Sequence, residues 1–142
     1  MRPLLFDSSV YIAAMRRADD QFLTIRHLPD NALVWLSAVV LEELYAGANN
    51  QGIHIVEQIE REFEAAKRIL TPNLNDWTDT GRLLSRVASK YHYEKIARGR
   101  LTNDALIAMS AARTGIRVVT LNERDFRRLA EFREFQWELA TP

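Results

Sequence analysis

The stretch IRVVT, residues 116–120, carries the strongest strand signal in the chain and decides the class of fold. Gly115, directly before it, suits the left-handed end of a preceding helix. Two more short apolar runs, LLF at residues 4–6 and ALVWL at residues 32–36, are each followed by a helical pattern. Short buried strands that alternate with helices are typical of right-handed βαβ units. The sequence therefore predicts an α/β three-layer sandwich with a short central parallel sheet and helices on both faces.

Length and composition limit the possible functions. The chain has 142 residues, 47% hydrophobic and 27% charged, which indicates one folded domain over residues 1–142. It contains no cysteine, so disulfides, thiolate metal sites and a cysteine nucleophile are excluded. The three histidines are scattered, which argues against a histidine metal site. No apolar run is long enough to span a membrane and no signal-peptide core is present, so a cytoplasmic protein is expected.

The remaining elements follow from helix caps and periodicity. Ser37 is expected to cap a helix that ends near Gly47. Thr102 and Asn103 are expected to cap a helix that starts at Asp104. Further helices are predicted over residues 53–70, 74–93 and 125–134, with a short strand at 69–72 and an edge strand at 135–139.

Acidic residues follow the predicted strands, where an α/β sheet places its ligand crevice. Asp7 and Asp125 come shortly after predicted strands, Glu43 lies in the second turn of the helix that follows a strand, and Asp104 opens the helix that leads into the strand at 116–120. Each has a structural alternative: Asp7 and Asp125 as helix caps, Asp104 as a first-turn acid that complements the helix dipole, and Glu43 as part of a solvated face.

Four carboxylates at one sheet edge repel one another. Two unit charges about 4 Å apart cost about 4 kcal/mol at an effective dielectric near 20. A cation compensates that cost, and oxygen ligands suit Mg²⁺ or Mn²⁺. Such an ion activates water for phosphodiester cleavage.

Four stretches of the chain resemble the motifs of the PIN domain family, the nuclease fold of VapC-type toxins. They are LFDSSVYI at residues 5–12, SAVVLEELYAG at 37–47, NDALIA at 103–108 and VTLNERDF at 119–126. Ser8 stands where threonine is common in the family. The resemblance implies an endoribonuclease that depends on Mg²⁺ or Mn²⁺ and cleaves single-stranded or loop RNA.

The resemblance also implies site residues and partners. Asp7, Glu43 and Asp104 correspond to metal-binding and catalytic acids of the family. Asn122 and Asp125 compete for the fourth position, to which we assign Asp125. Ser9, Thr120 and Asn122 are expected to support these acids. The family further implies a homodimer, the toxin of a toxin–antitoxin pair, and an antitoxin that covers the acidic cleft.

The basic residues are unevenly distributed. Residues 90–128 contain nine basic residues against four acidic ones, although the whole chain is neutral. Lys95, Arg98 and Arg100 are expected in a loop just before Asp104, where they would hold RNA phosphates. The alternative is a solvated surface without a ligand.

Two other functions remain as alternatives. A phosphatase with an aspartyl-phosphate intermediate on Asp7 needs a second aspartate two residues later, where this chain has Ser9. A non-catalytic module would use the same acidic cleft to bind a basic partner peptide. Metal-dependent hydrolysis of RNA distinguishes the nuclease from the binding module.

Overall fold

A five-stranded parallel sheet forms the centre of the protein. The computed structural model describes residues 2–17, 32–92 and 95–140. The strands are β1 (Arg2–Phe6), β2 (Ala32–Ser37), β3 (Ile69–Leu70), β4 (Arg117–Thr120) and β5 (Trp137–Leu139). They lie in the order β3-β2-β1-β4-β5, and every neighbouring pair is parallel. The predicted parallel sheet is therefore confirmed.

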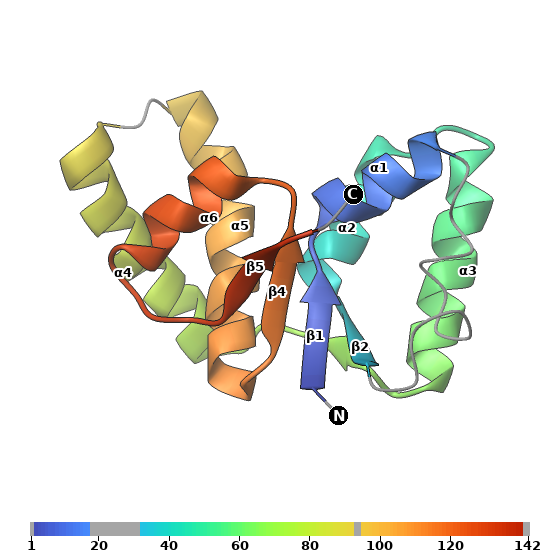
Figure 1. Ribbon diagram of the computed structural model, residues 1–142. Coiled ribbons are helices and arrows are strands. Elements are labelled where there is room, and N and C mark those ends of the chain that lie inside the picture. The colour runs from blue at the N-terminus through green and yellow to red at the C-terminus, as the bar shows by residue number, and fades with distance from the viewer. Residues whose placement is uncertain (1, 18–31, 93–94, 141–142) are drawn as a thin grey trace.

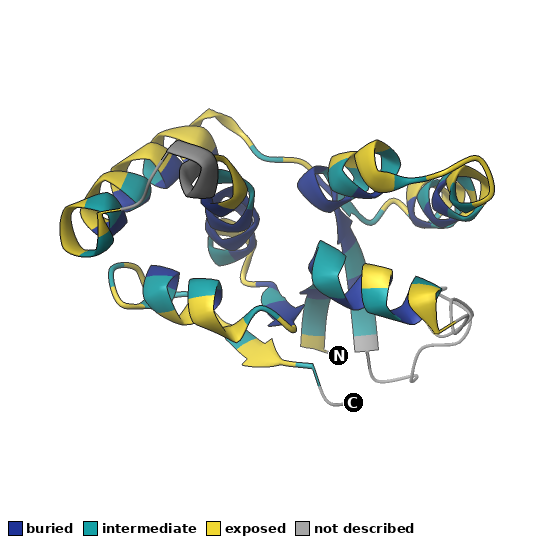
Figure 2. Cartoon of the chain, turned by 90° about the horizontal axis from the view of Figure 1, so that it is seen from above, coloured by how far each residue is buried: buried dark blue, intermediate teal, exposed yellow. Residues whose placement is uncertain are grey.

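The described residues form six helices around this sheet. They are α1 (Ser8–Arg16), α2 (Ala38–Gly47), α3 (Gly52–Ala65), α4 (Leu74–Tyr91), α5 (Lys95–Thr114) and α6 (Glu123–Ala130). In Figure 1, α4, α5 and α6 gather on the side of β4 and β5, and α1, α2 and α3 gather on the side of β1 and β2. The view from above shows helices on both faces of the sheet, as the sequence predicts (Figure 2). None of the described helices is long and apolar enough to cross a membrane.

Local side-chain chemistry determines where several helices begin and end. The Ser37 hydroxyl accepts a hydrogen bond from the backbone N–H of Val39 at 3.2 Å, which confirms the predicted cap of α2. Asn73 and Asp76 form a reciprocal capping box at the start of α4. Gly115 has φ +71° directly after α5, as expected of a residue that ends a helix in the left-handed region.

Helix α5 passes through the middle of the hydrophobic core. Its residues from Ala105 to Ala111 are all buried, and the helix contacts α2, α4, α6 and β4. A helix that is apolar all round is favoured only where other elements surround it. Asp104 stands at the end of this buried run. The packing of α5 therefore places the Asp104 carboxylate at the boundary of the hydrophobic core.

The start of α5 differs from the prediction. The helix begins at Lys95, nine residues before the predicted start at Asp104. Lys95, Arg98 and Arg100 therefore lie in the first two turns of a helix, and the loop predicted for them was wrong. Thr102 and Asn103 do not cap a helix but lie inside one. Leu101 is only 2% exposed, and its packing in the core stabilises a helix that continues through this point. This tertiary packing outweighs the local preference for a helix cap at Thr102 and Asn103.

A partly buried ion pair joins the start of α4 to the end of α5. The Nε atom of Arg113 donates to both oxygens of Asp76 at 3.0 Å, and the Asp76 side chain is only 2% exposed. Replacing Asp76 with alanine is expected to lower the free energy of unfolding by about 2–4 kcal/mol, because it removes the capping box and the carboxylate partner of Arg113, whose side chain is 36% exposed and can still be hydrated. The melting temperature should fall by about 10 °C.

A matched control for this prediction is Asp79→Ala, which breaks the exposed pair between Asp79 and Arg82 on the same helix. Exposed pairs contribute about 0–1 kcal/mol, so this variant should melt close to the wild type. Equal shifts in the two thermal melts would contradict the role assigned to Asp76.

Candidate active site

Asp7 lies between the carboxyl ends of β1 and β4. Its Oδ1 accepts hydrogen bonds from the backbone N–H of Ser9 at 3.0 Å and from the Ser9 hydroxyl, and its Oδ2 accepts one from the Thr120 hydroxyl at 2.6 Å. Burial raises the pKa of Asp7, and the hydrogen bonds from Ser9 and Thr120 oppose that shift. The carboxylate is thus held in one orientation by two neighbouring segments.

Ser9 and Thr120 also connect these segments to each other. The Ser9 hydroxyl accepts a hydrogen bond from the backbone N–H of Leu121 at 3.1 Å. The Thr120 hydroxyl accepts one from the backbone N–H of Asn122 at 2.9 Å. Both side chains therefore orient Asp7 and fix the turn after β4, which carries Asn122.

Asn122 connects two further carboxylates. Its side-chain amide nitrogen donates to Oδ2 of Asp104 and to Oδ2 of Asp125, each at 3.1 Å. Asp104 comes from α5 and Asp125 from the first turn of α6, so one amide group joins two helices at the sheet edge. Asn122 and Asp125, the two candidates for the fourth position, are therefore direct neighbours in space.

Asp104 shows the strongest electrostatic effect of the cluster. Its pKa is raised from 3.8 to about 8, first by burial and then by the negative charges of the other three carboxylates, Asp7, Asp125 and Glu43. The positive charge of Arg100 opposes this shift. The other three predicted acids therefore all lie close enough to Asp104 to make loss of its proton less favourable, although the four come from different parts of the chain.

Glu43, in α2, completes the cluster. Burial raises its pKa, with a smaller contribution from the charge of Asp7, and hydrogen bonds from the side chains of Asn103 and Ser8 oppose the shift. Its Oε1 atom is buried and has no hydrogen-bond partner among the described residues. A buried carboxylate oxygen without a partner is costly, and a cation is one group that satisfies it.

The contacts of Ser8 and Asn103 with Glu43 were not predicted from the sequence. Asn103 was interpreted as a helix cap, but it lies inside α5. Successive residues of a helix point about 100° apart, so Asn103 faces Glu43 while Asp104 takes part in the contact with Asn122. Ser8, the first residue of α1, likewise contacts Glu43, while its neighbour Asp7 is bound by Ser9 and Thr120. The signal available in the sequence was the position of each polar residue directly beside a predicted acid.

The structural alternatives for the four acids have mixed outcomes. Asp7 is the N-cap of α1, so that interpretation is confirmed and coexists with a place in the cluster. Asp104 is the tenth residue of α5, so it is not a first-turn acid. The cap position of α6 is occupied by Asn122, while Asp125 lies in the first turn. Glu43 is half-buried, whereas its neighbour Glu42 is exposed.

The donor set fits a hard divalent cation in its chemistry. Every charged donor is a carboxylate oxygen, the ligand type that Mg²⁺ and Mn²⁺ prefer. Within the described residues, no three acidic or histidine side chains converge closely enough to hold an ion as they stand. The Asn122 amide lies between Asp104 and Asp125 and makes the contacts that a cation would replace. Repulsion among the carboxylates gives a physical reason for the open arrangement.

The basic residues predicted near the site are only partly described. Arg100 is exposed and close enough to Asp104 to lower its pKa. The side chains of Lys95 and Arg98 lie outside the described part of the structure.

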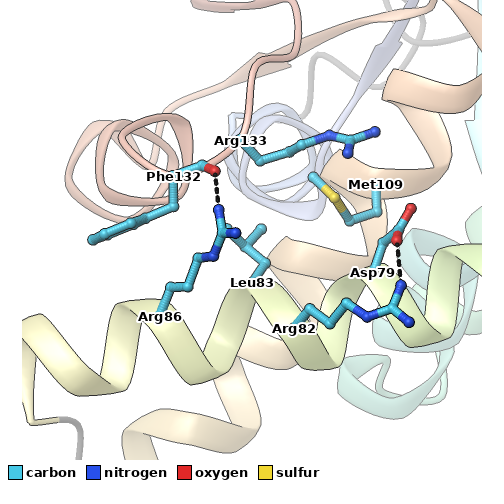
Figure 3. A pocket seen from close by; sticks show the side chains of 7 residues that line it. All are labelled: Asp79, Arg82, Leu83, Arg86, Met109, Phe132 and Arg133. Carbon is cyan, nitrogen blue, oxygen red and sulfur yellow. Dashed lines mark hydrogen bonds and ion pairs between the residues drawn. The ribbon is translucent and has the colours of Figure 1, made fainter.

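Two cavities differ in their relation to this cluster. The smaller, about 100 Å³, lies between α4, α5 and the residues after α6 and includes none of the predicted site residues (Figure 3). There Arg86 donates to the backbone carbonyl of Phe132 at 3.3 Å, which attaches the chain after α6 to α4. The larger, about 560 Å³, lies between α1, α2 and α3 and includes Glu43.

Fold and site together define a parallel α/β domain with a carboxylate cluster at the carboxyl ends of its strands. Residues 4–132 match the family model of the PIN domain, and the chain belongs to this family. No curated protein matches the chain in sequence.

Solved structures with the same fold include three toxin–antitoxin proteins. VapBC2 from Rickettsia felis, bound to a promoter DNA fragment, matches with a TM-score of 0.71 and 19% identity over 97% of this chain and 98% of that chain. DNA-bound VapBC from Salmonella typhimurium matches with a TM-score of 0.68 and 21% identity over 98% of both chains. VapBC-5 from Mycobacterium tuberculosis matches with a TM-score of 0.62 and 21% identity over 100% of both. At these identities the likeness shows the fold.

Proposed function

We propose that this protein is an endoribonuclease that depends on Mg²⁺ or Mn²⁺ and cleaves single-stranded or loop RNA. The observation that carries the proposal is the gathering of four carboxylates at one edge of the sheet, where the Asn122 amide joins Asp104 to Asp125 and where burial, together with the charges of Asp7, Asp125 and Glu43, raises the pKa of Asp104. Four neighbouring carboxylates repel one another when they are ionised, and this repulsion costs free energy unless a cation binds among them. Membership of the PIN domain family, whose members are generally nucleases, supports the same conclusion.

Each residue of the cluster has a role in this proposal. Asp7, Glu43, Asp104 and Asp125 would hold the ion, and the bound ion would supply an activated water and neutralise charge on the scissile phosphate. Ser9 and Thr120 keep Asp7 in its orientation, and Asn122 keeps Asp104 beside Asp125. Ser8 and Asn103 orient Glu43. Lys95, Arg98 and Arg100 would hold RNA phosphates.

We also propose that the protein is the toxin of a toxin–antitoxin pair and acts in the cytoplasm as a homodimer. The support is the likeness to VapBC structures over nearly the whole chain. In this proposal an antitoxin covers the acidic cleft. An arginine or lysine of that partner would pair with Asp7 or Asp104 and take the place of the ion's charge.

The direct test is hydrolysis of RNA by the purified protein in buffers that contain Mn²⁺, Mg²⁺ or a chelator. Cleavage is expected with either ion and none with the chelator, and the same protein should release no fragments from duplex DNA. If RNA remains intact under all conditions while a basic peptide binds the cleft without metal, the non-catalytic binding module is the correct function.

A separate prediction concerns Arg100, the described member of the proposed phosphate-binding group. Arg100→Ala should weaken RNA binding several-fold and reduce the slope of log affinity against log salt by about one, since one phosphate contact is lost. The measurement is fluorescence anisotropy with a labelled RNA in chelator, between about 50 and 200 mM salt.

Arg82→Ala is the matched control, because Arg82 is also an exposed arginine but lies at the cavity of Figure 3. It should leave the affinity and the salt slope unchanged. If the two variants behave alike, Arg100 belongs to a solvated surface.

A further inference from the structure

The larger cavity has an apolar floor and a polar rim. Its volume is about 560 Å³, and residues of α1, α2 and α3 line it, with α2 in contact with both α1 and α3. Leu44 and Val56, both buried, form part of the floor together with Met15. The rim carries three exposed polar side chains, Arg16, Asn49 and Gln51. Binding pockets for small organic groups combine apolar walls with a few polar groups in this way.

Glu43 belongs both to this cavity and to the carboxylate cluster. A group bound in the cavity therefore lies directly beside the proposed site of phosphodiester cleavage. An RNA strand continues on both sides of the phosphate that is cut, so at least one flanking nucleotide must pass close to Glu43.

We infer that this cavity is a subsite for one unpaired base of the RNA, next to the scissile phosphodiester. The inference rests on the proposed nuclease function and names a determinant of its sequence preference. The apolar floor would contact the face of the base. The Oδ1 atom of Asn49 already accepts hydrogen bonds from the backbone N–H groups of Gln51 and Gly52, so Asn49 would offer its amide N–H groups to the base. The Gln51 amide can both donate and accept, as the edge of a base requires, and the Arg16 guanidinium would be a stacking or phosphate partner.

Gly47 gives a direct way to test this subsite. It is the last residue of α2 and lines the cavity, and a Cβ placed on it would meet no atom within 4 Å. The first atom of a leucine side chain there therefore meets no steric obstacle. Gly81, in the middle of α4, has the same freedom but is exposed and does not line the cavity. Gly81→Leu is therefore the matched control for Gly47→Leu.

The experiment compares intact RNA oligonucleotides with oligonucleotides that carry an abasic nucleotide at each position around the cut. In the wild type, removal of one particular flanking base should lower kcat/KM about 10- to 100-fold, the effect of losing one stacked base. Gly47→Leu should lower kcat/KM for intact RNA by a similar factor and leave the abasic substrate unchanged. Gly81→Leu should behave as the wild type, and thermal melts check that both variants fold.

Two results would overturn the inference. One is an equal loss on intact and abasic substrates at every position, which would mean that the leucine disturbs catalysis itself. The other is no effect of Gly47→Leu on any RNA, which would assign the cavity to a protein segment instead.

A binding measurement that needs no cleavage distinguishes failure of the proposed nuclease function from failure of the base subsite. Titration of each nucleoside 5′-monophosphate should shift the backbone amide resonances of Gly47, Asn49 and Gly52 in the wild type and not in Gly47→Leu. Shifts without RNA hydrolysis would retain the base subsite and reject the nuclease. Neither shifts nor base-dependent cleavage would reject the subsite.

Discussion

Asp104→Asn is expected to lower the rate of RNA cleavage about 1,000-fold. The change removes one negative charge from the centre of the carboxylate cluster, and loss of a metal-held charge costs several kcal/mol of transition-state stabilisation. Asp104 is the cleanest position for this test because Asp7 also caps α1. Asp79→Asn, an acid on α4 outside the cluster, should retain full activity. The measurement is the single-turnover rate on one defined RNA.

A second pair of variants tests the same site from α2. Glu43→Gln should lower the rate by a similar factor, whereas Glu42→Gln should not, because Glu42 is its exposed neighbour. The double variant of Asp104 and Glu43 should be little slower than the slower single variant, since ligands of one ion act as a unit. Undiminished cleavage by Asp104→Asn would end the proposal that these carboxylates form the catalytic centre.

The stability of the metal-free protein is expected to fall as the pH rises from about 4 to about 8. The pKa of Asp104 is about 8 in the folded protein and 3.8 ordinarily, so the folded state holds a proton that the unfolded state releases in this range. The stabilisation is complete below pH 3.8 and is lost as the pH passes through 8. The raised pKa values of Asp7 and Glu43 act in the same direction. For Asp104 the change is on the order of 5 kcal/mol, or about 10–20 °C in melting temperature.

Thermal melts in chelator at several pH values measure this effect. Asp104→Asn should lose the part of this slope that Asp104 contributes and keep the part due to Asp7 and Glu43, and Asp79→Asn should keep the full wild-type slope. Mn²⁺ at one hundred times its Kd should stabilise the wild type by about 2.7 kcal/mol at neutral pH and by less at pH 5, where binding must first displace the proton. A melting temperature that rises with pH in chelator would contradict the assignment of the raised pKa to Asp104.

Much of the fold and the identity of the four acids followed from local sequence patterns. Apolar runs at residues 4–6, 32–36 and 116–120 are strands of one parallel sheet. Because parallel strands end at the same edge, residues that follow them meet in space. This rule applies directly to Asp7 and Asn122, which are within one to two residues of a strand end. Their neighbourhood could therefore be predicted without coordinates.

The start of α5 depended on packing between distant parts of the chain. Thr102 and Asn103 carry good capping side chains, and a local reading places a helix start there. Burial of Leu101 among other elements favours continuation of the helix through that point. Tertiary packing outweighs a capping preference of about 1 kcal/mol, and no local pattern reports it.

The sequence by itself determined which short apolar runs become strands of one parallel sheet, and it predicted that acids near their carboxyl ends gather at one edge of that sheet. Only the tertiary structure decided how that cluster is organised. Asn122 joins Asp104 to Asp125, and Asn103 contacts Glu43, which is 60 positions earlier in the chain. The pKa of Asp104 is a sum over burial and three charges from other elements, so it exists only once the chain has brought those groups together.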